Sequence, residues 1–382
     1  MRGLAKTRGG KLIAVTVLTD DVGTVTACHI DGDFFIEGDD DASRNLIADL
    51  EQTLARCAAD HGDCNPSAAW SANLRHTLNR HPDAQLVGVD ADTMALALER
   101  AITPAGEQSA ASSSALSSAS SSQQPMTAEK PIVAASDGDA TLWRDRWQRL
   151  HPHIVHDIPR TPDEQMTIDE RWAREVAAGD RPATLRFWEW SSPAIVVGRF
   201  QSIPDEVHED RARQSGFTIV RRCTGGGAMV VQPDGAITYS LYAPLWFIDG
   251  LDAADAYRIC DGWLVDALRG LGMDAGFQGL NDIASPRGKI GGAAQRRFPG
   301  GQHDHGGPGA VLHHTTLAYR LDGELMADVL NTSPIKLADK AVRSASRRVD
   351  PLHRQAAPLG IGRDDLIRLL SRAAQHYAAD GE

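Results

Sequence analysis

The sequence predicts an α/β (α+β) protein of two domains, a small α+β domain over residues 1–100 and a larger domain over residues 141–382. Its 382 residues suffice for two domains with a sizeable core in the larger one. Strand and helix patterns follow one another in the first hundred residues. Residues 101–130 then hold nine serines and almost no large apolar residue. Such a composition cannot offset the entropy of ordering by burial, so we expect residues 101–140 to be a flexible linker.

The small domain is predicted to begin with a β-hairpin. Over residues 10–30, apolar and polar residues alternate on both sides of a turn sequence, Asp20 to Gly23. A helix is expected over residues 42–58, a second near Trp70, and a third that Asp90 is placed to cap. Each helix is predicted from apolar residues that recur on one face: Leu46, Ile47, Leu50 and Leu54, then Leu74 and Leu78, then Met94 and Leu98. We expect these residues to pack in the core.

The most informative stretch of the larger domain is RRCTGGGAM, residues 221–229. Gly225 to Gly227 lack the Cβ atom that would keep their backbone amides from a ligand, so they can lie against a flat or elongated substrate. Arg221 and Arg222 place fixed positive charge beside them, which suits a phosphate or a carboxylate. Taken alone, the segment is better explained as a glycine turn between two strands with arginines on its rim.

A second segment, NDIASPRGKIGGAAQ, changes that balance. Asn281 and Asp282 carry oxygen atoms suited to Mg²⁺, which proteins usually bind through one or two carboxylates together with phosphate oxygens. Lys289 lies among small residues, where its ammonium could reach a buried anion, although most lysines are simply solvated at the surface. The two segments together predict a site that activates a carboxylic acid with a nucleotide.

Eight short segments in order make the chain after residue 141 resemble the lipoate–protein ligase family of the biotin/lipoate ligase fold. They are FWEW (187–190), VVGRFQ (196–201), RRCTGGGAM, ITYSL (237–241), NDI, GKIGGAAQRR, LHHTTL (312–317) and KLADKAVRS (336–344). The resemblance implies a catalytic domain with mixed, largely antiparallel sheets and flanking helices. It also implies that lipoate and ATP form lipoyl-AMP and pyrophosphate, and that the lipoyl group then passes to a lysine of a carrier domain. Whether lipoate or octanoate is preferred stays open.

The resemblance also assigns roles to residues. Lys289 would contact both the acyl carbonyl and the α-phosphate, acting by charge and positioning and not as a covalent nucleophile. Asn281 and Asp282 would face Mg²⁺ and the phosphates, with Asp282 as the metal ligand. The acyl and adenylate pocket would be walled by the remaining site residues: Arg221, Arg222, Thr224, Gly225, Gly226, Gly227, Ala228, Gly292, Ala293, His314 and Thr316.

A resemblance covers the small domain as well. GGKLIAVTV and HIDGDFFIEG are similar to the accessory domain of lipoate ligases, which is a separate polypeptide in some relatives and lies at the carboxyl end in others. Here it comes first, and the linker would raise the effective concentration of the two domains. The implied partners are lipoyl carrier domains, either of 2-oxoacid dehydrogenase E2 subunits or of the glycine cleavage H protein.

Three positions depart from the family pattern. Val231 stands where many relatives have histidine, Gly291 where a serine is frequent, and Thr315 in place of the usual glycine of an HHGTL pattern. These departures bear on substrate identity more than on fold.

Composition excludes several other classes. A net charge of −12 argues against broad nucleic-acid binding. No apolar run approaches the length of a bilayer span, and the amino terminus leads into a strand pattern without a signal-peptide core, so we expect a cytoplasmic protein. The spacing of five cysteines shows no disulfide framework, which favours reduced thiols: Cys28, Cys57, Cys64, Cys223 and Cys260.

Three further polar groups have weaker explanations. Cys57, His61 and Cys64 could gather around zinc, as could His303 and His305 beside the two histidines of LHHTTL, but neither group has the spacing of a known zinc motif. A basic patch near the end is either a solvated helix end or a contact with the adenylate or the carrier domain. It comprises Lys336, Lys340, Arg343, Arg347 and Arg348.

Other functions remain as alternatives. Octanoyltransferases of the same fold use a cysteine nucleophile, which one branch places near residues 281–283, but no cysteine follows Cys260. Cys260 itself lies in an apolar pattern that predicts a core-facing helix: Tyr257, Ile259, Trp263, Leu264 and Leu268. Biotin ligation is disfavoured because no GRGRxGR-like loop is present. A non-catalytic lipoate-binding protein is favoured by Val231 and Gly291, whereas Lys289 and the Asn281–Asp282 pair count against it.

Overall fold

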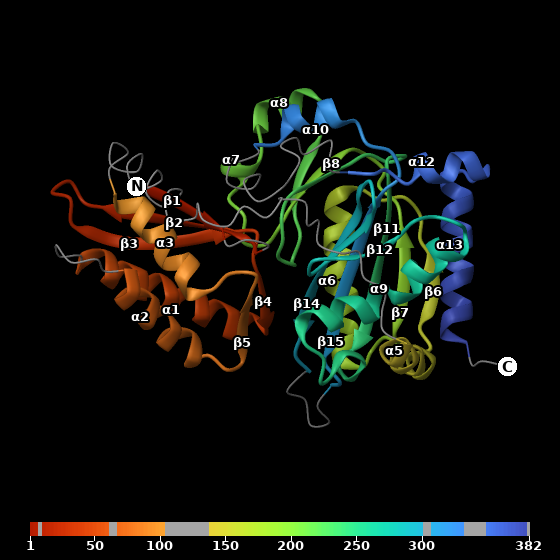
Figure 1. The fold of residues 1–382 in the computed structure, drawn as a ribbon, viewed down its shortest axis with the longest axis horizontal. Helices are drawn as coiled ribbons and strands as arrows, with labels where there is room; N and C mark the ends of the chain where they lie inside the picture. Colours follow the sequence, from red (N-terminus) through yellow and green to blue (C-terminus); the bar gives the residue numbers. More distant parts are fainter. Residues whose placement is uncertain (7–9, 61–66, 104–136, 301–306, 332–348, 380–382) are drawn as a thin grey trace, which may run out of the picture. The chain divides into compact units, whose positions relative to one another are not determined.

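The computed structural model describes residues 1–6, 10–60, 67–103, 137–300, 307–331 and 349–379 (Figure 1). The chain divides into two compact units, Met1–Pro131 and Ile132–Glu382. No helix in the described ranges is long and apolar enough to cross a membrane.

The first unit is an α+β structure. Its antiparallel sheet has the order β1-β2-β3, and a two-stranded sheet pairs β4 with β5. The elements are β1 (Arg2–Lys6), β2 (Leu12–Thr19), β3 (Val25–Gly32), β4 (Phe35–Gly38), α1 (Asp40–Ala59), α2 (Ser67–Asn79), β5 (Ala84–Val87) and α3 (Ala91–Ile102). The predicted hairpin is confirmed as β2 and β3. Asp20 accepts hydrogen bonds from the amides of Val22 and Thr24, and Gly23 has a φ of 87° that favours glycine.

The three predicted helices of this unit are also confirmed. Helix α1 begins two residues earlier and ends one later than the pattern suggested, and it buries every apolar residue of that pattern except Ile47, which is half-buried. Helix α3 has Asp90 as its N-cap, since the Asp90 carboxylate accepts a hydrogen bond from the Thr93 amide. In α2, Trp70 and Leu74 are buried.

The second unit contains a seven-stranded sheet of order β12-β13-β14-β15-β11-β7-β6 and a three-stranded sheet of order β10-β8-β9. Only the β6–β7 and β8–β9 pairs are parallel in the described residues, which confirms the mixed, largely antiparallel architecture. The strands are β6 (His153–His156), β7 (Thr184–Trp188), β8 (Ala194–Val197), β9 (Thr218–Arg221), β10 (Met229–Val231), β11 (Ala236–Pro244), β12 (Gly276–Gln278), β13 (Asp282–Ser285), β14 (Gly288–Phe298) and β15 (Ala310–Ala318).

Helices cover both faces of the seven-stranded sheet. Helices α5 (Asp137–Leu150), α9 (Ala253–Gly270) and α13 (Arg363–Ala378) bury one face, and α6 (Pro162–Ala178) packs on β11 and β15 from the other. Shorter segments complete the unit: α7 (Ile203–Glu206), α8 (Glu209–Gln214), η1 (Leu245–Ile248), α10 (Gly323–Val329), α12 (His353–Ala356) and η3 (Ala357–Leu359). Because side chains alternate along each strand, neighbouring residues face different helices.

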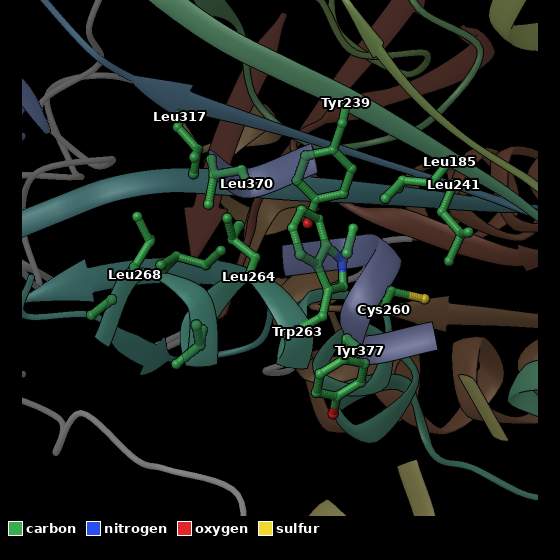
Figure 2. Close-up of a cluster of buried hydrophobic side chains, with 14 of the residues drawn as sticks. Leu185, Tyr239, Leu241, Cys260, Trp263, Leu264, Leu268, Leu317, Leu370 and Tyr377 are labelled. Carbon is green, nitrogen blue, oxygen red and sulfur yellow. The ribbon is translucent and has the colours of Figure 1, made fainter. Parts of the chain in front are cut away.

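The predicted core-facing helix around Cys260 is confirmed as α9. Every apolar residue of its pattern is buried, and Cys260 lies among the buried hydrophobic side chains of Figure 2. Trp263 packs against Tyr239 with ring centroids 5.1 Å apart, so aromatic contacts tie α9 to the middle of the sheet. Most of this face of the sheet is packed core.

Candidate functional site

The two segments singled out in the sequence meet on the α6 side of the large sheet. RRCTGGGAM forms the end of β9, a loop over residues 222–228, which we call the glycine loop, and the start of β10. The second segment forms a hairpin, with β13 leading through a short turn into β14. Lys289 is the second residue of β14, where it pairs with Ala284.

A β-bulge turns the Lys289 side chain toward the site. Lys289 and Gly291 pair with the successive residues Ala284 and Ile283, so Ile290 is an extra residue on β14. As a result the Lys289 ammonium lies over the backbone of Gly292, where an added Cβ would be only 2.7 Å from Nζ. The absence of a side chain at Gly292 thus leaves room for the ammonium.

Asp282 completes this pair. Its register partner is Gly292, and its Oδ1 lies 2.7 Å from Lys289 Nζ. The Lys289 side chain keeps 42% of its surface exposed, so an anion arriving from solvent can still reach it. Beside it, the Asn281 side-chain amide donates a hydrogen bond to the carbonyl of Ala293 at 2.6 Å.

A chain of contacts connects Lys289 to the glycine loop. Gly292 pairs with Thr316 on β15, and His314 lies two residues away on the same face of that strand. His314 Nε2 is 2.8 Å from the hydroxyl oxygen of Thr224 in the glycine loop. The structure therefore brings together the predicted residues Lys289, Asp282, Gly292, Thr316, His314 and Thr224.

Ala293 is differently placed. Its register partner Thr315 donates a hydrogen bond to Asp261 of α9, so the side chains at this level of the two strands face the α9 core. The Ala293 side chain therefore faces away from the α6 side, and the Ala293 backbone pairs with Asn281.

The glycine loop is held by close backbone packing and by Arg222. Gly226 has a φ of 92°, and its carbonyl oxygen would lie 2.0 Å from a Cβ added at Gly198. The buried Arg222 guanidinium donates to the carbonyls of Gly225 at 2.7 Å and Gly227 at 2.9 Å. Glycine at positions 198 and 226 therefore serves the folding of the loop itself.

Arg221 also donates to protein carbonyls. Its Nη1 reaches three of them, at Gly198, Arg199 and Gln201, with distances of 2.7, 3.1 and 2.8 Å. Both arginines thus tie the glycine loop to the VVGRFQ segment, a role that sequence reasoning did not foresee. Their contact with a bound ligand stays a prediction, as does that of Ala228.

A buried carboxylate on helix α6 holds several side chains of the site in place. Asp169 of α6 accepts a hydrogen bond from the hydroxyl of Tyr242 at 2.5 Å and from Ser240 at 2.8 Å. Its other oxygen lies 2.8 Å from His314 Nδ1. Because Nδ1 faces a carboxylate, it carries the ring proton, and Nε2 is left to accept a hydrogen bond from Thr224.

The pKa directions agree with this assignment. Burial by itself raises the pKa of Asp169, but the hydrogen bonds from His314 and Tyr242 and the charge of Arg186 outweigh it and hold the pKa below its usual value. Burial, together with the charges of Arg222 and His313, lowers the pKa of His314 below its usual value although Asp169 raises it. A neutral imidazole beside an ionised carboxylate results.

Sequence reasoning missed Asp169 entirely. The available signal is its place one helical turn after Gln165, since both are polar residues on the buried face of α6. A polar residue on the inward face of an amphipathic helix usually has a buried partner.

The described cysteines are not prepared for nucleophilic attack. Burial raises the pKa of the Cys223 thiol to about 12 and that of Cys260 well above its usual value. Cys28 and Cys57 are free and buried, and burial raises their pKa values as well. A thiolate, the reactive form, is therefore scarce at each of these positions near neutral pH.

The described residues contain no group of three His, Cys, Asp or Glu side chains that could hold a metal ion. At Asp282 one carboxylate is already paired with an ammonium, so Mg²⁺ there would need its other oxygen donors from phosphates. Several predicted groups lie outside the described ranges: His61 and Cys64, His303 and His305, and the basic patch Lys336, Lys340, Arg343, Arg347 and Arg348.

The three departures from the family pattern have structural surroundings that explain them. Thr315 lies on the α9 face, in a buried polar cluster with His313, Tyr239 and Asp261. A Cβ at Gly291 would lie 2.6 Å from the carbonyl oxygen of Thr316, so a serine requires the strands to shift. Val231 packs in an apolar cluster with Trp188 and Trp190.

Comparison with known proteins gives one consistent family. The model of the lipoyl protein ligase A/B catalytic domain matches residues 161–374. Lipoate-protein ligase A subunit 1 of Thermoplasma acidophilum is 29% identical over 198 residues, which are 51% of this chain and 73% of that protein. Octanoyltransferase LipM of Lysinibacillus sphaericus is 27% identical over 207 residues, 48% of this chain and 71% of that protein.

Among solved structures, the chain is similar to a bi-partite lipoate protein ligase from Thermoplasma acidophilum, described together with its E2 lipoyl domain. The identity is 26% and the TM-score 0.48, over 60% of this chain and 85% of that one.

The His314 assignment predicts a pH-dependent stability. The pKa of His314 in the folded chain lies below the ordinary 6.5, so its contribution to stability is full above pH 6.5 and is lost as the pH falls through the lowered value. We expect the urea midpoint of the wild type to fall more between pH 7.5 and pH 5 than that of His314→Gln, which has no ring to protonate. Equal slopes for the two proteins would contradict a buried neutral His314.

Proposed function

The chain belongs to the lipoyl protein ligase A/B family, and we propose that it is an ATP-dependent lipoate–protein ligase. It activates lipoate or octanoate as an acyl-adenylate and transfers the acyl group to a lysine of a carrier domain. The observation that supports this best is the position of the Lys289 ammonium. Asp282 holds it over Gly292, which has no side chain. Only strand β15, through His314, lies between this part of β14 and the glycine loop in the described residues.

In the first step an oxygen of the substrate carboxylate attacks the α-phosphorus of ATP, and the bond to pyrophosphate breaks. Two anions must approach each other, so a fixed cation between them lowers the barrier by electrostatic stabilisation and by positioning. Lys289 can supply that charge because its ammonium is half-exposed and lies over Gly292, which has no side chain to displace it. Asp282 keeps the ammonium in place before the substrates arrive.

In the second step the amine of a carrier lysine attacks the acyl carbon, and AMP leaves with the electrons of the broken bond. The mixed anhydride is already activated, so no thiolate of the protein is required. This chemistry agrees with cysteines whose pKa values are raised by burial.

ATP, magnesium and the carrier are part of the proposal. Asp282 is the proposed magnesium ligand, with the remaining oxygens coming from phosphates and water. The carrier is a lipoyl domain of a 2-oxoacid dehydrogenase E2 subunit or the glycine cleavage H protein. An E2 lipoyl domain accompanies the similar Thermoplasma ligase in its structural description.

An octanoyltransferase is the second candidate, because relatives at 27% identity carry that name. Such an enzyme would take the acyl group from an acyl-carrier protein and hold it on a protein thiol. One assay separates the two: purified protein with lipoate and ATP should release AMP and pyrophosphate in step with carrier acylation. Acylation from an acyl-carrier protein without ATP would support the transferase instead.

We expect Lys289→Ala to abolish acyl-adenylate formation while the protein stays folded. Loss of one preorganised charge costs ~3 to 4 kcal/mol of barrier, or about a hundredfold or more in rate. Pyrophosphate release is the measurement, and circular dichroism is the check on folding. Lys289→Arg is the matched control: it keeps a positive charge at this position, so it should lose less than Lys289→Ala. Wild-type adenylation by Lys289→Ala would remove Lys289 from the mechanism.

Cys223→Ser and Cys260→Ser should both still ligate lipoate with ATP, since no thioester is formed. Cys223 lies in the glycine loop, so its replacement can weaken substrate binding modestly through packing. ATP-dependent acylation of a lipoyl domain, followed by mass spectrometry, is the readout. If the wild type transfers octanoyl groups without ATP and either serine variant fails to do so, the acyltransferase is the correct function.

We further propose that residues 1–100 act as the accessory domain, joined by a linker to a catalytic domain at 141–382. The linker is shorter at both ends than the expected residues 101–140, because α3 extends to Ile102 and α5 begins at Asp137. A protein cut within 105–125 should be active only when its halves are mixed at high concentration, because the tether no longer supplies effective concentration. Partial deletion within this stretch should leave activity nearly unchanged. Full activity of residues 141–382 alone at every step would show that the first domain is dispensable.

A further inference from the structure

A short carboxyl-terminal segment, residues 349–352, lies against the backbone of Lys289. Val349 forms a parallel bridge with Lys289, and the Asp350 amide donates a hydrogen bond to the Lys289 carbonyl at 2.8 Å. The pairing of β14 with β15 begins only at Gly291, so this segment supports β14 at a level that β15 does not reach. Two residues later, the Leu352 amide donates to the carbonyl of Ala318 at the end of β15.

The Asp350 side chain holds the turn that precedes Lys289. It is completely buried, and its Oδ2 accepts a hydrogen bond from the Ser285 hydroxyl at 2.6 Å and a longer one from Arg287 Nε at 3.3 Å. The Ser285 oxygen in turn accepts a hydrogen bond from the Arg287 amide at 3.0 Å. Asp350 thus fixes the β13–β14 turn with its carboxylate and Lys289 with its backbone.

Burial of the Asp350 carboxylate does not by itself add to the stability of the fold. Its Oδ1 accepts no hydrogen bond from any described residue, and the two guanidinium groups beside the carboxylate are not in close contact with it: Arg287 lies 3.3 Å from Oδ2 and Arg354 3.8 Å from Oδ1. A buried charge with an unsatisfied oxygen costs free energy, and a well-packed apolar residue often serves stability better. The arrangement is better explained by the geometry that it imposes on the turn and on Lys289.

We propose that Asp350 is a positioning residue for Lys289, acting through the β13–β14 turn and not by contact with the reactants. This inference rests on the proposed role of Lys289. One attachment holds Ser285 and Arg287, just before Lys289, and the other is at the Lys289 carbonyl, so loosening them frees the strand that carries the ammonium. A displacement of about 1 Å at a reacting group can lower turnover about a hundredfold, so a clamp of this kind affects kcat more than substrate binding.

The kinetic test compares Asp350→Ala, Asp350→Asn and Ser285→Ala in the full-length protein. In Asp350→Ala we expect kcat for acyl-adenylate formation to fall about ten- to a hundredfold while the KM for lipoate stays within about twofold. Asp350→Asn keeps an oxygen that accepts from Ser285, so it should restore most of the turnover. Asp365→Ala, a change to an exposed aspartate on α13, should behave as the wild type.

Hydrogen exchange gives a readout that does not depend on the reaction. The Arg287 and Asp350 amides should exchange faster in Asp350→Ala than in the wild type. The Arg287 amide should also exchange faster in Ser285→Ala. The Ser285→Ala variant provides the test if Asp350→Ala does not fold. If the wild type makes no acyl-adenylate, the ligase proposal fails, but amide exchange rates still show whether Asp350 holds the β13–β14 turn. Wild-type kcat in folded Asp350→Ala and Ser285→Ala, or unchanged exchange of both amides, would overturn the positioning role.

Discussion

The site depends on one buried charge, the carboxylate of Asp169. It joins helix α6 to two strands of the sheet and, through His314, to the glycine loop. Burying a carboxylate costs free energy unless its oxygens are hydrogen-bonded, and both oxygens of Asp169 are. The same bonds decide the tautomer of His314 and hence the direction of the Thr224 hydroxyl.

The second constraint is the close approach of backbones around Lys289. Gly292 leaves space for the ammonium, and Gly291 lies too near β15 for any side chain. The bulge at Ile290 then turns an otherwise regular strand so that the lysine faces the polar side. The two glycines therefore have separate reasons: Gly292 gives the Lys289 ammonium room, and Gly291 allows β14 and β15 to pack closely.

Local signals in the sequence predicted much of the fold and part of the site. The Asp20–Gly23 turn, the caps and apolar stripes of the first unit, and the helix around Cys260 each depend on neighbours within a few residues. The glycine loop and Lys289 were found by their unusual composition. Asp169 and Asp350 were missed because their partners lie far along the chain, and a lone aspartate carries no local sign of such a contact.

The two faces of the sheet also explain why departures from the family pattern need not alter the chemistry. Thr315 donates to Asp261 in the core beneath α9, whereas its neighbour His314 meets Asp169 on the other side. Successive residues of one strand thus lie in different environments, and a substitution at Thr315 changes only contacts in the core beneath α9. The neutral His314 sits between an ionised aspartate and a threonine that also accepts from Arg222. Each hydrogen bond from Arg222 through Thr224 and His314 to Asp169 therefore has a defined donor and acceptor, and this order holds the glycine loop in one orientation.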